Sequence, residues 1–166
     1  MHIDDSASQF VAAMRGWAAS VCVLSASSAD GKRHAMTVTS FTPISIEPPC
    51  VLVCANMQSS VCAALQEGRP FTINLLHSNQ QDLSMLCADN DRIAERMASD
   101  EWLYDASGTP WLQTAQANFF CTQLQLHEVA THTVVMAQVD KINCNNSCDP
   151  LIYLNGHYHG SMDGKP

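Results

Sequence analysis

The sequence has few charged residues, and basic residues are the scarcest. Only 14% of its 166 residues are charged, and 8 Lys and Arg stand against 16 Asp and Glu, for a net charge of −8. Because no run of Lys or Arg could follow a phosphate backbone, we do not expect nucleic acid as a partner. Hydrophobic residues make up 46% of the sequence, so few charged groups are available to hydrate the surface of a monomer. We therefore expect a homodimer, in which part of that surface is covered.

Long hydrophobic runs are also missing. No window approaches the roughly 20 apolar residues of a membrane span, and the first residues do not form a basic head followed by an apolar run. We therefore expect a cytoplasmic protein with no membrane partner. Its eight cysteines are expected to be reduced thiols, since several lie inside apolar stretches where a thiol behaves as a small core residue.

The sequence lacks the Gly-x-Gly-x-x-Gly motif, βαβ alternation and internal repeats, which argues against a Rossmann domain and against repeat folds. The length fits one domain over 1–166, with a core over about 10–158. Several β-segments with small helical insertions are present instead. This pattern predicts a mainly β protein with an antiparallel barrel.

Periodicity and chain-breaking residues set the expected elements. Helices are expected over 8–17, 59–68, 79–88 and 91–99, the last two as separate helices or one kinked helix. Strands are expected over 21–25, 33–38, 41–46, 50–55, 71–76, 117–129, 133–142 and 151–158. Asp30-Gly31 is a hairpin signal, and Pro48-Pro49 must end a strand. The continuous apolar run from Cys50 to Ala55 predicts a strand buried on both faces.

One predicted helix start is suited to bind an anion. Ser59-Ser60 begins this helix, its first turn contains no Asp or Glu, and Glu67 lies at the opposite end. Because a helix N-terminus carries free N–H groups and partial positive charge, it can hold a phosphate without Lys or Arg. Thr37, Thr39 and Ser40 add hydroxyl donors. The alternative is that the serines only cap the helix and the Thr-Val-Thr-Ser run is an ordinary strand.

Four segments carry a resemblance to the flavin reductase family: Ala35–Phe41, Cys50–Asn56, Ser59-Ser60 and Phe71–Leu76. The resemblance runs from about Phe10 to Tyr158. It implies a Greek-key split β-barrel that binds FMN or FAD and reduces it with NADH or NADPH. The flavin-lining residues that it implies are Thr37, Val38, Thr39, Ser40, Cys54, Ala55 and Asn56, with Ser59, Ser60 and Val61 at the phosphate.

The chain departs from the family pattern at several positions. Met57 stands where an Arg is common, Val61 replaces a Thr, and Leu86-Cys87 replaces a basic-aromatic pair. The arginines that could compensate are Arg15, Arg92 and Arg96. By resemblance, His132 would contact the nicotinamide or the flavin edge as the catalytic residue, but Ala130-Thr131 precedes it where the family has Gly-Asp.

A possible zinc site requires separate consideration. Cys144-x-x-x-Cys148 and His157-x-His159 offer soft or borderline ligands, although their spacing is unusual for zinc. A reversible disulfide and a polar turn are the alternatives, and we expect the polar turn and no metal.

The leading hypothesis is a flavin reductase that supplies reduced flavin to a flavin-dependent oxygenase. A flavin-retaining enzyme or binding module that does not use NAD(P)H is the alternative, and a haem- or metal-binding split barrel is a third reading.

Overall fold

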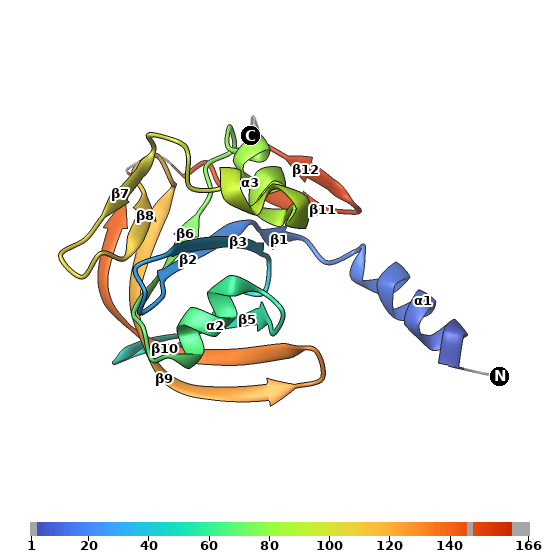
Figure 1. Ribbon diagram of the computed structural model, residues 1–166. Helices are drawn as coiled ribbons and strands as arrows, with labels where there is room; N and C mark the ends of the chain where they lie inside the picture. The colour runs from blue at the N-terminus through green and yellow to red at the C-terminus, as the bar shows by residue number, and fades with distance from the viewer. Residues whose placement is uncertain (1–2, 146–147, 161–166) are drawn as a thin grey trace.

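The computed structural model describes residues 3–145 and 148–160 (Figure 1). Its helices are α1 (Ile3–Met14), α2 (Ser60–Gln66) and α3 (Gln81–Ala88), followed by the 3-10 helix η1 (Asn90–Glu95). The strands are β1 (Ala19–Ser20), β2 (Cys22–Ser27), β3 (Arg33–Val38), β4 (Thr42–Ile46), β5 (Pro49–Asn56), β6 (Phe71–Leu75), β7 (Trp102–Tyr104), β8 (Pro110–Leu112), β9 (Ala117–Val129), β10 (His132–Cys144), β11 (Ile152–Leu154) and β12 (His157–His159).

One antiparallel sheet organises the molecule. Its seven strands run in the order β3-β2-β6-β9-β10-β5-β4, and the sheet curls around α2 (Figure 1). The edge strands β3 and β4 are not hydrogen-bonded to each other in the described chain. The prediction of a mainly β, antiparallel protein is therefore confirmed, while the sheet is curled without being closed. None of the described helices is long and apolar enough to cross a membrane.

Two hydrophobic clusters lie on opposite faces of β2. Cys22, Leu24 and Ala26 join the cluster beneath α2, whereas Val23 belongs to the cluster that contains Trp102. Every residue of β2 is consequently buried. This strand, in the middle of the fold, is therefore covered on both sides.

The expectation that 50–55 is buried on both faces is wrong for the single chain. Burial alternates along β5: Val51, Val53 and Ala55 face the core, while Leu52 and Cys54 are only partly covered. The apolar run is real, but no layer of the described chain packs on its second face. A continuous run shows that both faces are apolar and does not show what covers them.

The predicted last strand is also wrong, because 151–158 forms the hairpin β11-β12. Asn155 (φ 52°) and Gly156 (φ 80°) make its turn, and Asn-Gly is a known hairpin signal. The structure also shortens the helix expected over 91–99 to η1 and places the first helix at Ile3–Met14 instead of 8–17. The short hairpin β7-β8 was not expected.

Candidate functional site

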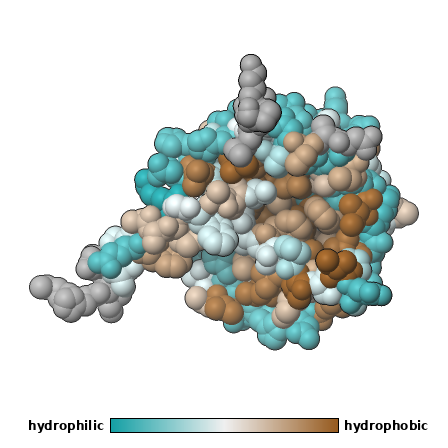
Figure 2. Space-filling view, turned by 180° about the vertical axis from the view of Figure 1, so that it is seen from behind, coloured by the Kyte–Doolittle hydropathy of each residue, from teal (hydrophilic) through white to brown (hydrophobic). Residues whose placement is uncertain are grey.

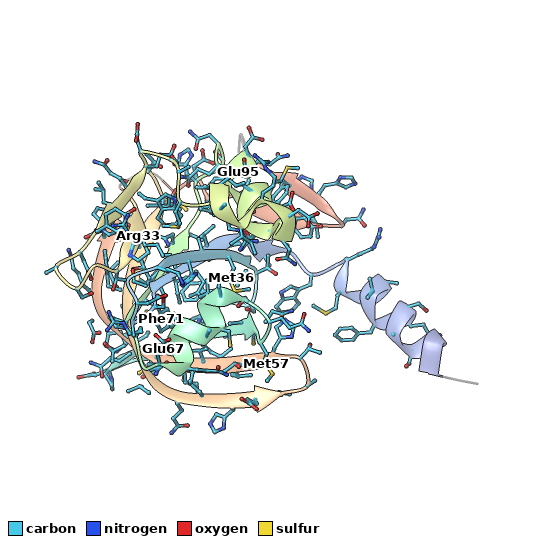
Figure 3. All side chains as sticks on the ribbon, viewed as in Figure 1. Arg33, Met36, Met57, Glu67, Phe71 and Glu95 are labelled. Carbon is cyan, nitrogen blue, oxygen red and sulfur yellow. The ribbon has the colours of Figure 1, made fainter. Side chains whose placement is uncertain are left out.

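A cavity of about 400 Å³ lies where β3, the end of β5, the start of α2 and the α3-η1 segment meet. Its volume is in the range of small-molecule sites. Figure 3 shows Met57 near the start of α2, Glu67 at the other end of the helix, and Met36 on β3 across from it. The lining residues are Met36, Thr37, Asn56, Gln58, Ser59, Ser60, Cys87, Ala88, Asn90, Ile93 and Arg96. Four of the predicted flavin-binding residues, Thr37, Asn56, Ser59 and Ser60, are therefore brought together.

The start of α2 leaves hydrogen-bond donors free. Ser59 is the N-cap: its hydroxyl accepts from the Cys62 N–H (3.1 Å) and donates to the Asn56 carbonyl (2.7 Å). The N–H groups of Ser60 and Val61, at the first helical positions, have no intrahelical partner. The Ser60 hydroxyl makes no hydrogen bond to another described residue. With no acid in the first turn, this end of α2 is favourable for an anion.

Arg96 adds a positive charge to the cavity. Its side chain is buried, with 4% exposed, and Nη1 and Nη2 donate to the carbonyls of Ala35 (2.8 Å) and Asp89 (2.7 Å). Its Nε is buried without a hydrogen-bond partner, and no described carboxylate forms an ion pair with it. A buried guanidinium without a counter-ion is costly by itself, so an anion in the cavity would be strongly favoured.

Of the three compensating arginines considered from the sequence, only Arg96 reaches the cavity. Arg92 is exposed and pairs with Glu95 at 2.6 Å, and Arg15 follows the projecting helix α1. Sequence spacing could not single out Arg96, because its contact with Ala35 joins residues that lie 61 positions apart. Cys87 also lines the cavity, and burial raises the pKa of its thiol to about 12, so it stays neutral.

A second cavity, of about 340 Å³, adjoins the first and shares Thr37 and Ala88 with it. Val38, the last residue of β3, and the following Thr39 form one side, and Tyr153, Gly156 and Tyr158 of the β11-β12 hairpin form another. The two tyrosine rings lie 5.2 Å apart, edge to face. The pair of cavities thus joins an anion site to a wall with aromatic and apolar groups, which suits a flat ligand with a phosphate tail.

Hydrogen bonds through Ser84 connect Thr37 to Tyr158, on two sides of the second cavity. The Thr37 hydroxyl donates to the Ser84 carbonyl (2.6 Å), and the Ser84 hydroxyl lies 2.9 Å from the Tyr158 hydroxyl. β3, α3 and β12 are therefore linked at the boundary between the cavities.

The side chains of Ser40, Cys54, Ala55 and Val61 line neither cavity. The Ser40 hydroxyl accepts from the Cys54 N–H (2.9 Å) and donates to the Cys54 carbonyl (3.1 Å), so it joins the loop after β3 to β5. Ala55 and Val61 are fully buried in the core. These residues could reach a ligand only through their main-chain groups.

His132 lies beside the site, outside both cavities. It is exposed at the start of β10, pairs in register with Asn56, and its Nδ1 is 2.9 Å from the Thr131 hydroxyl. Because Thr133 points into the core and neighbouring strand residues alternate, the His132 side chain points to the opposite face. Its link to the site is through Asn56.

The turn before His132 contains Ala130, which stands where the family pattern has Gly. Ala130 has φ 52°, a left-handed conformation in which glycine carries no Cβ penalty. We expect Ala130→Gly to raise the free energy of unfolding by about 1 kcal/mol, measured by urea denaturation. A matched change at Ala106, which does not have a positive φ, should lower stability or leave it unchanged. Equal effects at the two positions would contradict strain at Ala130.

The cysteine and histidine residues considered for zinc do not form a ligand set in the described residues. No group of three or more His, Cys, Asp or Glu side chains there could hold a metal ion. Cys144 and Cys148 are exposed free thiols, and all eight cysteines are unpaired.

Comparisons with known proteins identify the family of this chain. The family model for a flavin reductase like domain matches residues 14–162. An FMN reductase (NADH), RutF, from Pseudomonas syringae pv. syringae (strain B728a) is 33% identical over 147 residues, which cover 89% of this chain and 82% of that protein. The reductase component of an FADH(2)-dependent resorcinol hydroxylase from Rhizobium sp. (strain MTP-10005) is 33% identical, covering 90% and 84%.

A solved structure extends the similarity to the fold. The styrene monooxygenase flavin reductase (SMOB) from Pseudomonas putida S12 superposes with a TM-score of 0.82 at 31% identity, over 92% of this chain and 97% of that chain. The sequence match and the fold thus point the same way, and the chain belongs to the family of flavin reductase like domains.

Proposed function

We propose that this protein is an NADH-dependent flavin reductase that reduces FMN or FAD by hydride transfer and releases reduced flavin to a partner monooxygenase. The observation that carries the proposal is the buried Arg96, which lines the cavity at the open start of α2 and has no carboxylate partner among the described residues. Relatives named as an FMN reductase (NADH) and as the reductase component of a hydroxylase support the nucleotide and the partner class.

In this proposal, each segment of the site has a defined task. Arg96, the Ser60 hydroxyl and the N–H groups of Ser60 and Val61 hold the phosphate, and Val38 and Thr39 line the isoalloxazine ring. The nicotinamide and flavin supply the hydride chemistry, so the protein needs mainly to stack them in a dry slot. The wall of Tyr153 and Tyr158 would exclude water from that slot.

Two finer features belong to the same proposal. The curled sheet would be the Greek-key split β-barrel of this family, with α2 packed inside the curve of the sheet. The enzyme would act in the cytoplasm, where its eight free thiols would stay reduced.

Steady-state oxidation of NADH and of NADPH, each with FMN, FAD and riboflavin, tests the function. Turnover with NADH and a phosphorylated flavin is the expected result. Bound flavin without turnover would favour a flavin-retaining protein instead, a reading motivated by Met57 and by Ala130-Thr131 at family positions for Arg and Gly-Asp. No flavin binding would contradict both.

His132 is the proposed residue at the hydride end. We expect His132→Ala to raise the KM for NADH and to lower kcat/KM about tenfold or more, as removal of a group that contacts the reacting rings would do. His127→Ala, at another exposed position on β9, serves as the control. If the rate and KM are unchanged, His132 is not part of the site.

The proposed assembly is a homodimer that covers the second face of β5 and β10. Leu52 is paired in register with Met136, and Cys54 with Val134, and all four are only partly covered. Figure 2 shows apolar residues spread over the face of the body beside the projecting helix α1. On α1 and just after it, Phe10 (66% exposed) and Trp17 (67% exposed) lack contacts that would cover them. A second copy would cover both apolar surfaces.

Met136→Glu should therefore convert a dimer to a monomer, because a carboxylate buried in the interface would lack a partner. Light scattering after size-exclusion chromatography measures the mass. Gln113→Glu adds the same charge at an exposed position near β8 and should leave the dimer intact. A wild-type monomer at micromolar concentration would contradict the proposed interface.

A further inference from the structure

The phosphate end of the site has only one basic side chain within the described residues. Arg96 is the one Lys or Arg among the residues that line the cavity. Several other described basic side chains are engaged elsewhere: Lys32 pairs with Asp30 at 2.8 Å, Arg33 stacks on Tyr104 at 3.8 Å, and Arg92 pairs with Glu95. The cavity can therefore neutralise one phosphate group and has no second cation for another.

A depression of about 410 Å³ continues from the cavity, and Ser60 lines both. Glu67 and Asp30 contribute two carboxylates to it and Lys32 one ammonium group, so its net charge is negative. Glu67 has no basic ion-pair partner in the described chain, and its Oε2 accepts from the Ala29 N–H at 2.7 Å.

His34 lines the same depression but adds little positive charge. Its pKa is lowered mainly by burial, which outweighs the opposite effects of Asp30 and Glu67, so the imidazole is mostly neutral near pH 7. On the other side of the site, a depression on the outer face of α3 and η1 also has more acid than base: Asp82 and Glu101 against Arg92. The one Lys or Arg that lines each depression, Lys32 or Arg92, is already paired with a carboxylate.

FMN and FAD differ in what they would place on these surfaces. FMN ends in a phosphomonoester, which carries a charge of about −1.5 to −2 and three acceptor oxygens at pH 7. FAD has a singly charged, doubly substituted phosphate at the equivalent position, followed by a second charged phosphate and an adenosine. The second phosphate would meet the carboxylates beyond Ser60.

We infer, on the basis of the proposed function, that this site selects FMN over FAD, with Arg96 as the ligand of a terminal phosphomonoester and Glu67 as the specificity residue that repels the second phosphate. Glu67 lies about 10 Å along α2 from Ser60, so its carboxylate would act on the second phosphate and the adenosine of a dinucleotide that follows the helix through repulsion across several ångströms and not through contact. Like-charge repulsion at this surface would lower the affinity for FAD more than the affinity for FMN.

Dissociation constants for FMN, FAD and riboflavin, measured by quenching of flavin fluorescence, test this inference. The wild-type protein should bind FMN about tenfold more tightly than FAD. Glu67→Lys should tighten FAD binding about tenfold while FMN binding changes less than about threefold, and Glu67→Gln should lie between. Glu67→Lys gives up the hydrogen bond from the Ala29 N–H, but Lys near the C-terminus of α2 interacts favourably with the helix dipole, and Glu67→Gln keeps an acceptor for that N–H.

Asp100→Lys is the matched control, since Asp100 is exposed ahead of β7 and lines none of the four cavities and depressions described above. Its FMN-to-FAD ratio should equal that of the wild type. The inference is overturned if wild type binds FAD as tightly as FMN, or if Glu67→Lys tightens both flavins equally. NADH turnover with FAD in those cases would leave the proposed function standing, whereas no binding of any flavin would overturn the proposed function itself.

Discussion

Replacing Arg96 with Ala is expected to weaken FMN binding by about 100-fold, or ~3 kcal/mol, while riboflavin binding changes little. The reason is that, among the described residues, Nε of this buried guanidinium has no hydrogen-bond partner and no carboxylate neutralises the charge. A bound phosphate would supply both the hydrogen-bond acceptor and the negative charge. Fluorescence titration with FMN and with riboflavin measures the two affinities, and their ratio isolates the phosphate contribution.

The Arg96 result must be separated from a structural effect. Arg96 also donates to the carbonyls of Ala35 and Asp89, so its loss would loosen η1 against β3. Arg96→Lys keeps the charge without the forked donors and should retain part of the selectivity for FMN over riboflavin. Arg92→Ala, which removes an exposed arginine of η1, should leave both affinities unchanged. Equal losses for FMN and riboflavin in Arg96→Ala would show that Arg96 only supports the fold.

Ser60→Asp is expected to change stability and binding in opposite directions. A carboxylate in the first turn of α2 interacts favourably with the helix dipole and should raise the free energy of unfolding by about 0.3–1 kcal/mol. The same carboxylate would lie where the phosphate binds, and we expect FMN affinity to fall by about 100-fold. Thermal unfolding and FMN titration on the same sample measure both effects.

Ser60→Asn is the uncharged control for this substitution. It has a similar shape to Asp and should bind FMN within about fivefold of the wild type, because it adds no like charge. A stabilised Ser60→Asp protein that still binds FMN normally would place the phosphate away from α2. That outcome would also require a different role for the free N–H groups at this helix start.

Local patterns in the sequence were sufficient where neighbouring residues decide the conformation. The Asp30-Gly31 turn is confirmed: Gly31 has φ 81°, and the Ser28 N–H donates to the Lys32 carbonyl. The helix that begins at Ser59-Ser60 is confirmed as well, with Ser59 as its cap. In both cases the hydrogen bonds that define the element join residues only a few positions apart.

Errors arose where distant segments determine burial or pairing. The run in β5 and the run in β2 are both apolar, yet only β2 has a layer on each side within the chain. The hairpin over 151–158 differs, because Asn155-Gly156 signals its turn locally, and only its pairing with another strand depends on a distant segment. The partner strand β1, which pairs with β11, lies more than a hundred residues earlier.

The amino-acid sequence by itself was enough to predict the family, the mainly antiparallel fold and four residues that the structure brings together in one cavity, Thr37, Asn56, Ser59 and Ser60. Only the tertiary structure decided which cation lines the cavity at the start of α2 and which carboxylates line the adjoining depression. Arg96 and Glu67 reach their places through contacts with Ala35 and Ala29, far away in the chain. Helix caps and turns depend on neighbouring residues, whereas the charge balance of a cavity depends on side chains brought together by folding.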